Sequence, residues 1–203
     1  MQRTLLATLF ACAAVLLPLS AHAEERLVMA PYPGPPPWHV VTNVTTAAGH
    51  LREQIPVDQK IEAYRDILTD QLFAGPVAVS PSEFLRGMFG RVSGACEAVR
   101  VNGPVDKVED GHPVAYAQIY CGHQIGSETG ANMFFKVIKG PKALYVIQRE
   151  FRVPPTKTAG VMTFDKAHAA DGLKLMKAQA TADAYLGDSV VLCGDGSTDA
   201  RCR

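Results

Sequence analysis

The middle of the chain alternates between apolar and polar positions in the way that half-buried β-strands do. Over residues 114–121 the small and apolar side chains fall at every second position: Ala115, Ala117, Ile119 and Cys121. Between them lie Tyr116, Gln118 and Tyr120. Apolar runs at 96–101, 133–138 and 143–151 flank this segment, with a long polar turn at 102–113, a loop at 122–130 and a tight KGPK turn at 139–142. This order predicts an antiparallel β-meander.

Two further strands are expected nearer the N-terminus. β-Branched residues dominate 40–46, and 51–57 would pair with them to form a hairpin. Trp38, the only tryptophan, precedes these strands and is expected to anchor the start of the fold. Pro154 and Pro155 are expected to end the sheet.

Helical spacing replaces this alternation in three places. Residues 60–73 place four apolar side chains on one stripe: Ile61, Tyr64, Leu68 and Leu72. Residues 80–83 (SPSE) supply an N-cap serine, a proline at N1 and a capping-box glutamate. Residues 164–186 carry a modest apolar stripe, ended by Gly187: Leu173, Met176, Ala180 and Ala184. We therefore predict an α+β fold in which an antiparallel meander is flanked by two to three α-helices.

The first 23 residues are interpreted as a signal peptide. Arg3 gives a positive start, residues 5–19 are apolar, and an AHA triplet ending at Ala23 is a small-x-small cleavage site. A competing interpretation makes Cys12 a lipid-acceptor cysteine. Phe10 is too bulky for that motif, so we favour cleavage after Ala23 over lipidation.

Cleavage would leave a proline-rich leader and one domain. Residues 24–37 carry five prolines, and we expect this leader to lie on the surface or extend from it. Residues 38–203 would form a single domain. We expect this domain to be periplasmic or secreted, because no later segment is long and apolar enough to span a membrane.

Four cysteines remain after cleavage, and an even number in an exported chain indicates disulfides. They allow three pairings. The pairs Cys96–Cys121 and Cys193–Cys202 are favoured because each closes a local loop, and the second pair would close the C-terminal tail. Zinc is disfavoured because the sequence has no Cys-x-x-Cys spacing.

The charge balance limits the classes of partner. The chain has 20 Lys and Arg residues against 20 Asp and Glu residues in 203 positions. It therefore lacks the basic excess that nucleic-acid binding requires, and it lacks a polybasic membrane patch. Hydrophobic residues make up 47% of the chain, which is enough to build a core.

No catalytic motif stands out in the sequence. There is no Walker loop, dinucleotide fingerprint or HExxH helix, and in 126–130 (GSETG) the serine is one place too early for a nucleophile elbow. His112 and His123 flank one predicted strand about 25 Å apart, too far to share a metal ion. We assign no catalytic, cofactor-binding or metal-ligating residues.

Several sequence segments together resemble those of a known group of proteins. They are PVDQKIEAYRDILTDQLF (56–73), SPSEFL (80–85), Cys96 with Cys121, and FFKVIKGPKALYVIQREFR (134–152). In this order they resemble small uncharacterised exported proteins of proteobacteria, over roughly residues 38–152. The resemblance implies a PsbP-like α+β sandwich, although that group has a tryptophan where Tyr64 stands. It implies no catalytic residues, and the photosynthetic role of PsbP is not carried across.

Three functions are compatible with these features. The leading hypothesis is a non-enzymatic module that binds an envelope protein or a small ligand through aromatic side chains on the sheet: Tyr116, Tyr120, Phe134 and Tyr145. The runner-up is a hydrolase-like enzyme whose site is assembled from distant residues such as His112, His123, Glu128 and the loop serines. The third is an envelope-associated structural protein docked by its leader.

Overall fold

The computed structural model describes residues 25–33, 36–161, 164 and 166–203, so the predicted signal peptide, its cleavage site and Cys12 lie outside the described residues. The centre of the fold is a seven-stranded sheet in which all neighbouring strands are antiparallel. In spatial order its strands are β2 (Trp38–Thr46), β3 (Gly49–Pro56), β4 (Asp66–Ala74), β8 (Ala143–Val153), β7 (Gly130–Lys139), β6 (His112–Cys121) and β5 (Val99–Glu109).

Two further strands, two α-helices and two 3-10 turns complete the described fold. A two-stranded sheet pairs β1 (Arg26–Met29) with β9 (Val190–Cys193), and the helices are α1 (Pro81–Gly94) and α2 (Ala169–Asp188). Two single 3-10 turns lie at Ile61–Ala63 and Ala200–Cys202. Neither described α-helix is both long and apolar enough to cross a membrane.

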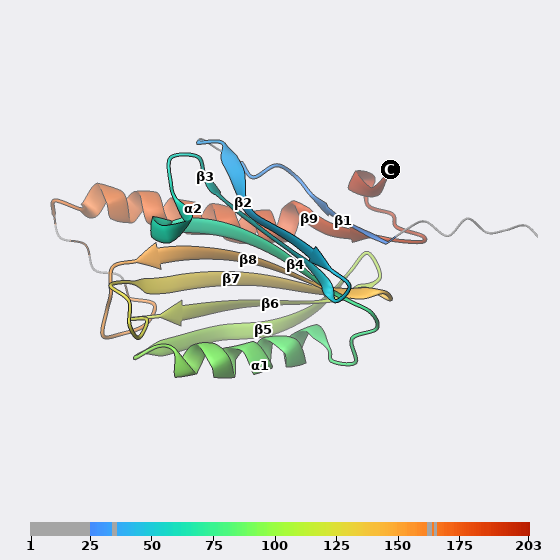
Figure 1. Ribbon diagram of the computed structural model, residues 1–203, viewed down its shortest axis with the longest axis horizontal. Coiled ribbons are helices and arrows are strands. Elements are labelled where there is room, and N and C mark those ends of the chain that lie inside the picture. The colour runs from blue at the N-terminus through green and yellow to red at the C-terminus, as the bar shows by residue number, and fades with distance from the viewer. Residues whose placement is uncertain (1–24, 34–35, 162–163, 165) are drawn as a thin grey trace, which may run out of the picture.

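The large sheet lies between α1 on one face and α2 with the small sheet on the other (Figure 1). In β8, Leu144 and Val146 belong to the α1-side core, whereas Tyr145 and Ile147 belong to the α2-side core. Because both faces are covered, β7 and β8 are buried almost throughout, which explains their nearly continuous apolar sequence. The predicted antiparallel sheet with flanking helices is confirmed in outline, but strand far outweighs helix.

Residues 60–73 do not form the predicted helix. A single 3-10 turn is followed by β4, which pairs with both β3 and β8 in the middle of the sheet. Residues four apart share a face in a helix and also in a strand, so Leu68 and Leu72 satisfied the helical spacing while belonging to a strand. Pairing on both sides of β4 decides the outcome, which local spacing could not.

The predicted long turn at 102–113 is also wrong. β5 continues to Glu109 and pairs with β6 beyond a register shift between Asn102 and Val105. Only Asp110 and Gly111 turn the chain, with φ of 46° and 83°. Positive φ at both central residues is the geometry of a type I′ hairpin, for which Asp-Gly is a preferred sequence.

The helix starting after Ser80 is confirmed with its cap. The Ser80 side chain accepts a hydrogen bond from the Glu83 backbone N–H, and the Glu83 carboxylate accepts one from the Ser80 N–H. Pro81 occupies the first turn, where its missing N–H costs no helical hydrogen bond. This end of α1 was readable from four residues because every signal in it is local.

The last helix forms over Ala169–Asp188, so Gly187 lies inside it instead of ending it, and the predicted apolar stripe faces outward. Leu173 and Met176 are 69% and 58% exposed. The residues that α2 buries lie on another face: Gly172, Gln179, Ala182, Tyr185 and Leu186. Tyr185 and Leu186 offer more apolar area to the core than the alanines of the predicted stripe, so the packing selects their face.

The leader is part of the fold, contrary to the expectation that it lies on the surface or extends away. Residues 26–29 form β1 and pair with β9. Leu27, Met29 and Tyr32 pack against the α2-side core, as does Trp38, which confirms its anchoring role. The prolines between 31 and 37 therefore follow a paired strand.

Both predicted disulfides are confirmed. Cys96 pairs with Cys121 across a Cα–Cα distance of 5.7 Å, and Cys193 pairs with Cys202 across 5.4 Å. The first joins the loop after α1 to the end of β6, and the second closes the C-terminal tail onto β9.

Candidate functional site

The aromatic residues expected to form a binding surface lie on the α2 face of the sheet, where little of them is exposed. Phe134 and Tyr145 are buried, at 4% and 5% exposure. Tyr116 and Tyr120 are half-buried, and their hydroxyls donate to Glu109 and Gln118 at 2.8 Å each. The four rings therefore do not form one exposed surface.

Of the residues of the enzyme hypothesis, the structure separates His112 from the others, whereas His123, Ser127 and Glu128 belong to one loop. His112 and His123 lie at opposite ends of β6, where His112 is next to Gly194 of the tail. His123 places Nδ1 2.9 Å from Glu97 and donates from Nε2 to the Ser127 carbonyl at 2.8 Å. Both ring nitrogens are thus engaged, and the Ser127 hydroxyl contacts Thr129 rather than the imidazole.

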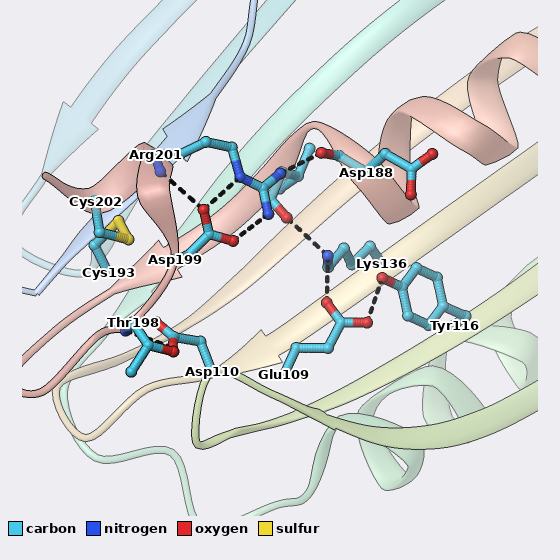
Figure 2. A network of polar contacts seen from close by, with 11 residues as sticks. Glu109, Asp110, Tyr116, Lys136, Asp188, Cys193, Thr198, Asp199, Arg201 and Cys202 are labelled. Carbon is cyan, nitrogen blue, oxygen red and sulfur yellow. Dashed lines mark hydrogen bonds and ion pairs between the residues drawn. A yellow bond between two sulfur atoms is a disulfide. The ribbon is translucent and has the colours of Figure 1, made fainter.

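A buried lysine organises one polar cluster (Figure 2). Lys136 on β7 is fully buried, and its ammonium lies 2.7 Å from the Glu109 carboxylate and donates to the Val190 carbonyl at 2.8 Å. Tyr116 donates to the same carboxylate. Burial lowers the pKa of Lys136, and Glu109 opposes that shift. The sequence signal for this cluster was a lysine inside an otherwise apolar strand.

The same cluster fastens the C-terminal tail. Arg201 is paired with Asp199 and donates to the Asp188 carbonyl at the end of α2. Thr198 donates from its backbone N–H and its hydroxyl to Asp110, at 2.9 and 3.1 Å. Figure 2 shows these contacts beside the Cys193–Cys202 disulfide. Because its charged groups are paired with one another, we interpret the role of the cluster as structural: it holds the tail against the β5–β6 hairpin.

A cavity of about 830 Å³ lies on the α2 face. Its walls come from the N-terminal half of α2, the end of β8 and the segments next to β2, β3 and β4. Four aromatic rings contribute to its lining: Tyr32, Trp38, Phe151 and Phe164. A pocket of this size and aromatic lining is typical of small-molecule sites.

Gly172 shapes the α2 wall of this cavity. A Cβ at Gly172 would lie 2.5 Å from Cδ2 of Phe164, so the absence of a side chain allows that ring to lie directly against the helix. The glycine that interrupts the apolar pattern of α2 is therefore required by packing.

Arg149 forms the structural base of the cavity. It is fully buried on β8, and its Nη2 lies 2.6 and 2.8 Å from the two carboxylate oxygens of Asp66. Its guanidinium carbon lies 3.9 Å from the ring centroid of Tyr32, 4.2 Å from that of Trp38 and 5.2 Å from that of Phe151. The four residues that contact Arg149 all line the cavity, so the guanidinium lies directly behind its wall. They are Asp66, Tyr32, Trp38 and Phe151.

The Asp66 carboxylate, which lines the cavity, is paired with Arg149. Burial raises the pKa of Asp66 to about 6, against the opposing effect of Arg149, so the carboxyl is ionised at neutral pH. Cation–π contacts with a desolvated arginine contribute about 2 kcal/mol or more each, and here they hold Tyr32 and Trp38 against the guanidinium.

The sequence did not reveal the cavity because its residues are far apart in the chain. Tyr32 and Trp38 were assigned to a surface leader and to the start of the fold, and Arg149 to an ordinary strand. Arg149 stands between Gln148 and Glu150, so the local sequence did not signal its burial. Among the described residues, no group of three or more His, Cys, Asp or Glu side chains is arranged to hold a metal ion.

No known family model matches the chain, and no curated protein shows significant similarity to it.

Replacing Glu109 with glutamine is expected to lower the free energy of unfolding by about 3 kcal/mol, because the buried Lys136 ammonium loses its carboxylate. Urea denaturation measures this loss. The matched control is Glu97→Gln, which removes a carboxylate from a largely exposed pair and is expected to cost far less. Equal losses in the two variants would contradict a special role for Lys136.

The pKa of His123 is raised by its hydrogen bond to Glu97 and, secondarily, by the bond to the Ser127 carbonyl. The pair therefore stabilises the fold fully below the ordinary histidine pKa of about 6.5, and this contribution is lost as the pH rises through the raised pKa. In Glu97→Gln the pKa of His123 should fall, as measured by NMR titration of the ring protons. Glu62→Gln, at an exposed site elsewhere, should not change it.

Proposed function

We propose that this protein is an exported, non-enzymatic binding protein that holds a small, largely apolar molecule in the cavity beside α2. The observation that carries the proposal is the cavity of about 830 Å³, lined by four aromatic rings. Pockets of roughly 300–1,000 Å³ with aromatic walls and few polar groups are the usual form of small-molecule sites.

The rigidity of the cavity supports binding. Tyr32 and Trp38 are fixed by Arg149 on one side and by each other, with ring centroids 5.1 Å apart, and Tyr32 also packs on Tyr185 at 4.9 Å. A wall that is ordered before the ligand arrives lowers the entropy lost on binding. The carboxylate at the base is paired with Arg149, so its role in this proposal is structural.

The exported location is part of the same proposal. Two disulfides are consistent with an oxidising compartment, and residues 1–23 have the pattern of a signal peptide. Glu25 accepts hydrogen bonds from the Tyr145 hydroxyl at 2.9 Å and the Lys142 N–H at 3.2 Å. Cleavage after Ala23 would therefore leave Glu25, and these two contacts, in the mature chain.

Binding can be tested with N-phenyl-1-naphthylamine, a neutral apolar dye. We expect saturable dye fluorescence and energy transfer from Trp38, which lines the cavity and is the only tryptophan. Ala178→Phe should fill the cavity and weaken binding roughly 10-fold or more, because Ala178 faces into it.

The control for this test lies on the same helix. Ala180→Phe adds the same ring on the exposed side of α2 and should leave binding unchanged. Thr181→Phe, a second filling variant, covers the case in which Ala178→Phe does not fold. Absence of saturable binding, or equal binding by the folded Ala178→Phe and Ala180→Phe variants, would overturn the proposed function.

Export can be tested by the intact mass of protein purified from the periplasm of an expressing bacterium. We expect a chain that starts at Glu24, with four cysteines that react with an alkylating reagent only after reduction. A lipid adduct on Cys12, or thiols that react before reduction, would contradict this part of the proposal.

A further inference from the structure

We infer that the ligand of this cavity is an amphipathic organic anion, with an apolar body between the rings and a negatively charged head group among the basic residues of the lining. This inference rests on the proposed binding function and specifies the chemistry of its ligand. It follows from the charges around the cavity and from the cation behind its wall.

The charges around the cavity are unequal. Four lining residues are permanently basic: Arg65, Arg152, Lys174 and Lys177. Three are acidic, but Asp66 is already paired with Arg149, which leaves Asp58 and Asp171. Arg152 lies close to the Glu150 carboxylate, but the other three basic residues still outnumber Asp58 and Asp171. The lining therefore favours an anion, in a chain whose overall formal charge is zero.

The buried cation excludes the opposite assignment. Tyr32, Trp38 and Phe151 resemble an aromatic cage for an ammonium ligand, but the guanidinium of Arg149 already occupies it. The ring faces that would bind a second cation are therefore already taken. The Asp66 carboxylate offsets the charge of Arg149, so the attraction for an anion comes from the basic residues of the lining.

One of the basic groups is held in place. The guanidinium carbon of Arg152 lies 3.9 Å from the ring centroid of Tyr64, and Arg152 lines the cavity. Its Nε is buried and makes no hydrogen bond to the described residues. A stacked arginine loses less conformational entropy when it pairs with a head group than a free surface lysine does.

The test compares two dyes that differ by one group. 1-Anilinonaphthalene-8-sulfonate is N-phenyl-1-naphthylamine with a sulfonate, which stays ionised across the accessible pH range. We expect the sulfonate dye to bind at least about 5-fold more tightly at low salt, as one or two partly exposed ion pairs allow. At an ionic strength of about 1 M, where the Debye length is about 3 Å, the preference should largely disappear.

Variants connect that preference to the cavity. The double variant Lys174→Gln, Lys177→Gln should reduce the sulfonate preference several-fold and leave the binding of the neutral dye unchanged. The control is Lys142→Gln, Lys157→Gln, which removes the same charge at exposed positions outside the cavity. Arg152→Gln should act in the same direction as the cavity double variant.

The outcomes separate the two proposals. If the neutral dye gives no saturable binding with energy transfer from Trp38, the binding function itself is wrong. If the neutral dye binds but the sulfonate dye binds no more tightly, the binding function stands and the anionic ligand is wrong. A sulfonate preference that survives in the cavity double variant, or that is lost equally in the control, would also overturn the inference.

Discussion

The buried guanidinium of Arg149 is the constraint on which the described structure depends most. A charge in the middle of a central strand must be paired and enclosed, because an isolated buried charge costs several kcal/mol. Asp66 pairs with it from β4, and Tyr32 of the leader and Trp38 at the start of β2 enclose it. One side chain thus connects β8 with β4 and with the N-terminal segment, and the enclosing groups form the cavity wall.

Lys136, on the neighbouring strand β7, does for the C-terminal segment what Arg149 does for the N-terminal segment: it holds that segment against the sheet. It pairs with Ile147 in the β7–β8 register and lies on the same α2 face as Arg149. Its partners are Glu109 and the Val190 carbonyl, and the adjoining tail is held by Arg201 and the Cys193–Cys202 disulfide. Two buried cations on the central strands therefore hold the N-terminal and C-terminal segments against the same face, where β1 and β9 also pair.

The predictable parts of the fold are those with local signals. The SPSE cap of α1, the strands 133–138 and 143–151 and the two local disulfides were readable because neighbours in the sequence fix them. The strand β4 was misassigned because Leu68 and Leu72 fit two periodicities, and only pairing with β3 and β8 distinguishes them. The buried face of α2 was predicted wrongly because the helix carries apolar side chains on two faces, and only one of them packs on the sheet.

The sequence by itself determined most strands of the antiparallel meander, helix α1 and the two disulfides, since strand alternation, capping and loop closure act over short distances. It also placed Lys136 inside an apolar strand, although it did not show which groups that lysine would contact. Only the tertiary structure decided that the leader covers Arg149 and that α2 lies over the same face. A cavity forms where segments distant in sequence fail to fill the space between them, so it has no local signal.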